Sequence, residues 1–104
     1  MKRCHTEERN QHRVVVLSGE VDLSWSQQVR REVLNALKSS DRVAVDLSAV
    51  SYIDSSGIAA LVEGFQQARG KGQQFVLLSA SPPVLAVLKL ARLDKVFQLV
   101  DKLD

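Results

Sequence analysis

Two short apolar segments separated by an amphipathic helical pattern constrain this chain more than any other feature. Arg42–Leu47 (RVAVDL) and Gln74–Leu78 (QFVLL) are rich in β-branched and aliphatic residues, as buried strands are. Between them, apolar residues keep the i, i+3, i+4, i+7 spacing of a helix at Ile58, Leu61, Val62, Phe65 and Ala68. Strand, helix and strand in this order pack as parallel neighbours joined by a right-handed crossover. The pattern therefore predicts an α/β fold.

The flanking segments extend this alternation in both directions. The further expected elements are strands over residues 3–8, 13–18 and 96–100, a helix over 27–38, and a helix opened by Ser81-Pro82-Pro83. The resulting order, β-β-α-β-α-β-α-β, predicts a mixed, mostly parallel sheet of four to five strands. Helices pack mainly on one face if the strands run in spatial sequence. We expect residues 1–104 to form a single domain.

The polar segments between these elements are expected to be turns and loops. Asn10 and Gln11 predict a turn, and Gly19 to Asp22 a loop after which Asp22 or Ser24 caps the next helix. A short polar loop is expected between Leu47 and Asp54. The aromatic residues Trp25, Phe65 and Phe97 are expected to serve packing and not ligand binding.

Charge and composition argue against several classes of protein. The net charge is +2, from 14 basic and 12 acidic residues, and the basic residues are scattered, so a nucleic-acid-binding stripe is missing. One cysteine, Cys4, permits no internal disulfide, which fits a reducing compartment. No apolar run approaches the roughly 20 residues that cross a bilayer, and no secretory signal pattern is present. We expect a cytoplasmic protein that binds no nucleic acid and does not insert into membranes.

The sequence lacks the usual catalytic and metal-binding signatures. It has no Gly-x-Ser-x-Gly turn and no His-Glu-x-x-His helix. The histidines, His5 and His12, have no metal-ligand spacing and are expected to be solvated. Gly64 to Lys71 has the wrong glycine spacing for a phosphate-binding loop and ends a helix. We expect no enzyme, metal or cofactor, and leave open an anion or nucleotide at a helix N-terminus.

The segment Val43 to Gly57, VAVDLSAVSYIDSSG, resembles the signature of the STAS family, and of its anti-sigma factor antagonists in particular. Gly19-Glu20-Val21-Asp22 is similar to that family's Gly-Glu-Leu-Asp, and residues 90–97 resemble its passage from last helix to last strand. The resemblance covers about Val14 to Val100. Two departures are an indistinct first strand and the few residues left after Val100, where many members carry a longer helix.

The resemblance implies that Ser56 is phosphorylated by a partner kinase. A phosphate at the first turn of a helix would find free N–H groups and the positive end of the helix dipole. Asp54 and Ser55 are expected to support the switch or cap the helix, and Gly57 to let a partner's nucleotide approach or to satisfy loop geometry. The residues expected to contact a partner are Asp22, Ala60, Glu63, Gly64 and Gln67.

Two functions follow from the resemblance and remain alternatives at this point. In the first, the chain binds an anti-sigma factor serine kinase while Ser56 is unphosphorylated, and a PP2C-type phosphatase resets it. In the second, it is an accessory subunit of a lipid-transporting ABC transporter and docks on the ATPase. The intact Ser55-Ser56 pair favours the first function.

Overall fold

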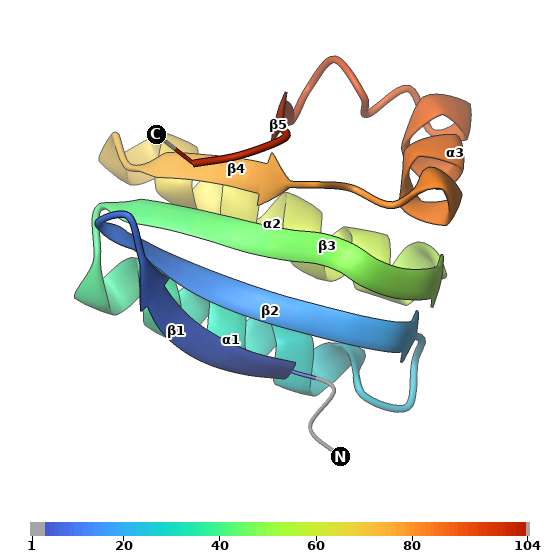
Figure 1. Ribbon diagram of the computed structural model, residues 1–104, viewed down its shortest axis with the longest axis horizontal. Helices are drawn as coiled ribbons and strands as arrows, with labels where there is room; N and C mark the ends of the chain where they lie inside the picture. The colour runs from blue at the N-terminus through green and yellow to red at the C-terminus, as the bar shows by residue number, and fades with distance from the viewer. Residues whose placement is uncertain (1–3, 104) are drawn as a thin grey trace.

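The computed structural model describes residues 4–103 and has an α/β fold built on one mixed sheet (Figure 1). The strands are β1 (Cys4–Arg9), β2 (His12–Val21), β3 (Arg42–Ile53), β4 (Gln74–Leu78) and β5 (Gln98–Val100). The helices are α1 (Ser26–Ser39), α2 (Ser55–Lys71) and α3 (Pro82–Leu90). This order of elements confirms the one predicted from the sequence.

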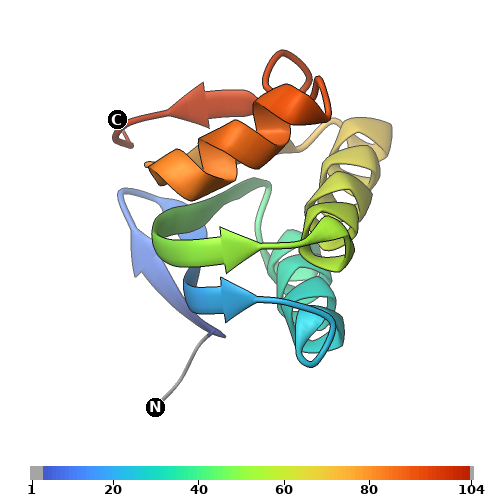
Figure 2. The same cartoon turned by 90° about the vertical axis from the view of Figure 1, so that its right-hand side faces the viewer.

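The strands lie in the sheet in chain order, from β1 at one edge to β5 at the other. β1 and β2 are antiparallel, and the turn between them has positive φ at Asn10 (50°) and Gln11 (64°), as a tight hairpin requires. Every other pair of neighbours is parallel. Right-handed crossovers between adjacent parallel strands return to the same side of a sheet, so α1 and α2 share one face (Figure 2).

The larger core lies between the sheet and these two helices. Its main contributors from the sheet are Val15, Leu17, Val43, Val45 and Leu77, and from α1 they are Val29, Val33, Ala36 and Leu37. The helix expected over residues 27–38 is therefore confirmed as α1. Trp25 and Phe97 are buried, and the rings of Phe65 and Phe97 meet edge to face at 5.5 Å, so the expected packing role of these aromatics is confirmed.

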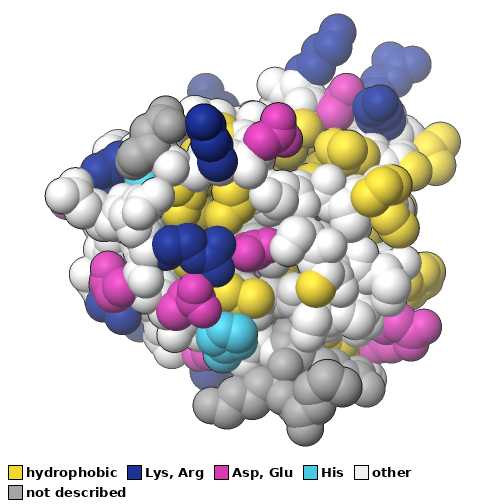
Figure 3. Space-filling model, viewed as in Figure 1, with side chains coloured by type: hydrophobic (Ala, Val, Ile, Leu, Met, Phe, Trp, Pro, Cys, Tyr) yellow, Lys and Arg dark blue, Asp and Glu magenta, His cyan; other side chains and the backbone are white. Residues whose placement is uncertain are grey.

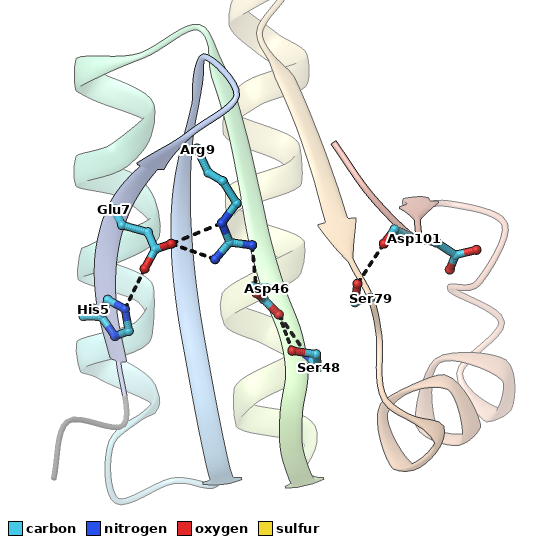
Figure 4. A network of polar contacts seen from close by, with 7 residues as sticks. All are labelled: His5, Glu7, Arg9, Asp46, Ser48, Ser79 and Asp101. Carbon is cyan, nitrogen blue, oxygen red and sulfur yellow. Dashed lines mark hydrogen bonds and ion pairs between the residues drawn. The ribbon is translucent and has the colours of Figure 1, made fainter. Parts of the chain in front are cut away.

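A polar network and a smaller apolar cluster occupy the opposite, helix-free face of the sheet. Val14, Ala44, Val76 and Leu78 form that cluster. Arg9 reaches beside it, donating to Asp46 at 3.2 Å and to Glu7 at 2.8 Å (Figure 4). Leu103 packs on the cluster, and its carbonyl accepts from Asn10 at 3.0 Å. Figure 3 shows apolar side chains between charged ones on this face.

Two strands are longer than predicted. Gly19 to Val21 belong to β2 and not to a loop, and β3 continues from Leu47 to Ile53 through the segment expected to be polar loop. The extensions pair with each other through register shifts, and Gly19 has the positive φ (72°) that such an irregularity needs. Burial of Val21, Val50 and Ile53 stabilises the two strand extensions. The apolar and polar residues do not alternate regularly along these segments, so the sequence pattern did not indicate strands.

Three smaller expectations at other positions are wrong. His12 is buried, 2% exposed, and its Nδ1 hydrogen-bonds the Asn10 carbonyl at 2.8 Å, so it is not solvated. α1 starts at Ser26 without a side-chain cap, so neither Asp22 nor Ser24 caps it. β5 starts at Gln98, because Phe97 turns into the core instead of pairing along β4.

Candidate functional site

The site forms where β3 ends and α2 begins. Asp54 is the N-cap of α2, with an extended backbone (φ −103°, ψ −174°), and its Oδ1 accepts from the backbone N–H groups of Ser56 (2.9 Å) and Gly57 (3.1 Å). The Ser56 hydroxyl donates to the same oxygen at 2.5 Å. Ser55, by contrast, is exposed and is the first helical residue, so the expectation that it caps the helix is wrong.

Hydrogen bonds to the Asp54 carboxylate keep it ionised. The Ser56 hydroxyl makes the largest contribution to a lowered pKa of Asp54. Burial opposes it as the second-largest effect, and the backbone N–H groups of Gly57, Ser56 and Leu23 lower the pKa further. Two of the N–H groups expected to receive a phosphate are thus already bound by a resident anion. A phosphate on Ser56 would meet the Asp54 carboxylate and not a vacant helix end.

The β2–α1 loop lies against this turn. The Asp54 N–H donates to the Val21 carbonyl at 3.1 Å, which joins the ends of β2 and β3. Within the loop, Asp22 Oδ1 accepts from the N–H (2.9 Å) and hydroxyl (2.5 Å) of Ser24, the same Asp-x-Ser turn that Asp54 and Ser56 form. The structure therefore brings Asp22 to the same edge of the sheet as Ser56.

Gly57 is needed for packing and not for access. The residue is buried, and an added Cβ would lie 2.7 Å from Ile53 Cγ1 and 2.8 Å from Val21 Cγ1. The first turn of α2 therefore sits directly on the ends of β2 and β3. The idea that Gly57 leaves room for a partner's nucleotide is wrong, since its missing side chain faces the protein interior.

The α2 residues expected to contact a partner are only partly exposed. Ala60 is 5% exposed, and a Cβ on Gly64 would lie 2.5 Å from Val33 of α1 and 3.1 Å from the Phe75 ring. Helix α2 packs on α1 as well as on the sheet. More of its circumference is therefore buried than its row of large apolar residues indicates. Placing Ala60 and Gly64 on an exposed surface was wrong; Glu63 is half-buried and Gln67 exposed.

A groove of about 560 Å³ runs between the first turns of α1 and α2. Ser55 and Ser56 line it at the start of α2, and Arg30 and Glu63 form an ion pair from α1 to α2 within it. Arg30 is the single basic residue and Glu63 the single acidic residue among those that line the groove. Sequence reasoning missed Arg30, because no local pattern shows which residue of α1 faces a residue of α2.

Exposed apolar side chains mark the same edge of the sheet. Leu23, next to Asp22, is 75% exposed, and Tyr52, two residues before Asp54, is 49% exposed. Tyr52 pairs in register with Glu20, so both lie where β2 and β3 end. The sequence does carry a signal for Leu23, because an apolar residue stands between the polar residues Asp22 and Ser24.

The described residues 4–103 give less support to a metal site, a membrane-crossing helix or a reactive cysteine. No three His, Cys, Asp or Glu residues in that range come together as a metal site, and no helix there is long and apolar enough to cross a membrane. Cys4 is buried, and burial followed by the nearby Glu32 charge raises the pKa of its thiol to about 12, so it is a poor nucleophile. The Ser56 hydroxyl at this edge is partly exposed, and the neighbouring Ser55 is exposed.

Comparison with known proteins decides the family. A family model described as "Mlab, STAS domain" matches residues 4–101. The chain belongs to the STAS domain family. The anti-sigma F factor antagonist of Paenibacillus polymyxa is 27% identical over 90 residues, which are 85% of this chain and 77% of that protein. The resemblance found in the sequence is thus confirmed.

Solved structures agree with this assignment. The crystal structure of an anti-sigma factor antagonist from Mycobacterium paratuberculosis has a TM-score of 0.85 and 27% identity to this STAS domain, covering 97% of it and 86% of that chain. The Bacillus cell fate determinant SpoIIAA in its phosphorylated form has a TM-score of 0.74 at 20% identity, covering 95% and 91%. At 20% identity, the similarity to SpoIIAA shows a shared fold and nothing more.

Proposed function

We propose that this STAS domain is an anti-sigma factor antagonist that acts as a phosphorylation-controlled protein-binding switch. While Ser56 is unphosphorylated, the domain binds a serine kinase that otherwise sequesters a sigma factor, and the sigma factor is released. The kinase then phosphorylates Ser56 and the complex separates. A PP2C-type phosphatase restores the binding form. All of this takes place in the cytoplasm, and the domain itself catalyses no reaction.

The Ser56 hydroxyl is the observation that carries this proposal. It is partly exposed at the start of α2 and donates to Asp54 at 2.5 Å, so its oxygen lone pairs face away from its hydrogen-bond acceptor. Rigid elements hold it, because Asp54 is tied to Val21 and Gly57 packs on Ile53. The similarity to anti-sigma factor antagonists, among them SpoIIAA, which has been solved in a phosphorylated form, supports control by phosphorylation in general.

The proposed modification is a simple phosphoryl transfer. Ser56 Oγ forms a bond to the γ-phosphorus of ATP, the bond from that phosphorus to the β,γ-bridging oxygen breaks, and ADP leaves. The hydroxyl proton passes to a base of the kinase, because the lowered pKa of Asp54 makes that carboxylate a weak acceptor. The product carries about −1.5 to −2 additional charge beside Asp54.

The proposed kinase-binding surface surrounds this residue. Leu23 and Tyr52 supply exposed apolar area at the sheet edge, and Asp22 lies at the same edge. Glu63 and Gln67 extend the surface along α2. A phosphate introduced into such a contact leaves a charge without water or a partner, which costs several kcal/mol at a closed interface.

A binding experiment with two substitutions of one residue tests the proposal. The serine kinase encoded nearest the gene is immobilised, and wild type, Ser56→Ala and Ser56→Asp are compared. We expect Ser56→Ala to bind like wild type and Ser56→Asp to bind about tenfold more weakly or worse, a loss of at least about 1.4 kcal/mol. Ser55→Asp is the matched control one residue away. Equal binding by Ser56→Ala and Ser56→Asp contradicts the switch.

The accessory-subunit function remains the second candidate because the groove between α1 and α2 is formed with Ser56 unmodified. An ABC transporter ATPase that docks there needs no phosphorylation. Co-purification with an ATPase subunit to the same extent for wild type, Ser56→Ala and Ser56→Asp would favour this function over the switch.

A further inference from the structure

The N-terminus of α2 does not by itself neutralise a phosphate on Ser56. Asp54 already accepts from the Ser56 and Gly57 N–H groups at 2.9 and 3.1 Å, and its carboxylate is ionised. A phosphate attached to Ser56 Oγ replaces the hydroxyl hydrogen that Ser56 now donates to Asp54 Oδ1. Phosphorylation thus removes a hydrogen bond and places a second anion beside the first, so a nearby cation would stabilise the phosphorylated form.

The groove beside Ser56 contains one such cation. Arg30 is the single basic residue that lines it, and its Nε donates to Glu63 Oε2. Both side chains are about half exposed, 47% for Arg30 and 42% for Glu63, so water already solvates this pair and it is weakly held. An exposed pair of this kind is typically worth less than about 1 kcal/mol.

The helix geometry allows Arg30 to change partners without moving the backbone. Ser56 and Glu63 are two turns apart on α2, but a helical side chain leans toward the N-terminus, so the Glu63 carboxylate lies nearer to Ser56 than its Cα does. Arg30 lies one turn after the start of α1 and leans the same way, toward the end of the groove that Ser55 and Ser56 line.

We propose that phosphorylation of Ser56 transfers Arg30 from Glu63 to the phosphate, so that the switch has a second component on α2. This rests on the proposed function, because it takes Ser56 as the phosphorylated residue. A phosphoserine offers about twice the charge of a carboxylate and three oxygens for a two-pronged guanidinium contact. The partner then meets both a phosphate and an unpaired Glu63 carboxylate, and the bridge between α1 and α2 is lost.

Phosphoserine incorporated at position 56 during translation tests the transfer without any kinase. The second pKa of the phosphate is followed by ³¹P NMR in the otherwise wild-type chain, in Arg30→Gln and in Arg31→Gln. Arg31 is the matched control, because it is the neighbouring arginine on α1 but does not line the groove. Asp22 and Asp54 are the same in all three proteins, so a difference among them reports the arginine.

We expect Arg30→Gln to raise the phosphate pKa by about 0.5 unit or more and Arg31→Gln to leave it within about 0.2 unit. Glu63→Gln frees Arg30 and is expected to lower it. In the wild-type chain, the Arg30 Nε–H resonance is expected to shift when position 56 changes from serine to phosphoserine. Equal phosphate pKa values in Arg30→Gln and Arg31→Gln overturn the transfer, while the kinase-binding result for Ser56 stands or falls separately.

Discussion

Gly57 provides a stringent stability test, because replacing it with alanine inserts one methyl group between α2 and the strands that carry the site. That methyl group would lie 2.7 Å from Ile53 Cγ1, 2.8 Å from Val21 Cγ1 and 3.1 Å from the Val21 carbonyl oxygen. Both Cγ1 atoms belong to β-branched side chains, which have few alternative rotamers. The first turn of α2 must therefore shift, and overpacking of this kind costs about 1–3 kcal/mol.

A smaller favourable term opposes that cost. Alanine is favoured over glycine by up to about 1 kcal/mol inside a helix, and by less in the first turn. The net expectation for Gly57→Ala is a loss of about 0.5–2.5 kcal/mol in the free energy of unfolding. For a chain of this size, each kcal/mol lowers Tm by about 4–8 °C.

Gly70→Ala is the matched control in the same helix. An added Cβ there meets no atom within 4 Å, and the residue is exposed. Only the preference of a helix for alanine over glycine remains, so this variant is expected to be more stable than wild type by about 0.5–1 kcal/mol. Urea unfolding of the three proteins, followed by circular dichroism, measures both changes. Two substitutions with the same sign, or a Gly57→Ala variant as stable as wild type, would refute this account of α2 packing.

Two further outcomes concern titratable groups. Because hydrogen bonds lower the folded-state pKa of Asp54 below 3.8, its charge contributes stability above about pH 4, and this is lost as pH falls through the folded pKa. Asp54→Asn keeps a cap oxygen but not the charge, so its deficit in unfolding free energy against wild type should shrink in acid, and a deficit independent of pH would contradict this. Cys4, with a thiol pKa of about 12, should react with a disulfide reagent at pH 8 much more slowly in the folded protein than in urea; equal rates would show that it is accessible.

The alternation of strands and helices was readable from the sequence because each element carries its own periodicity. Val43 and Val45 of β3 and the spaced apolar residues of α1 and α2 are local signals, and short connections between them admit few topologies. The Asp54-Ser55-Ser56-Gly57 element was likewise visible, since a capping residue before an apolar helical run marks a helix start.

The roles inside that element depended on the tertiary structure. Val21 and Ile53 decide whether Gly57 leaves room for a partner or allows close packing. Both lie in the ends of strands that the sequence pattern predicted to be shorter. Whether Gly64 faces solvent is decided by Val33 on another helix. The sequence by itself determined which segments form elements and in what order, because that information repeats within a few residues. Only the folded chain decided which faces meet, and so placed Arg30, Glu63 and Ser56 along one groove, because contacts between distant segments leave no periodicity in either one.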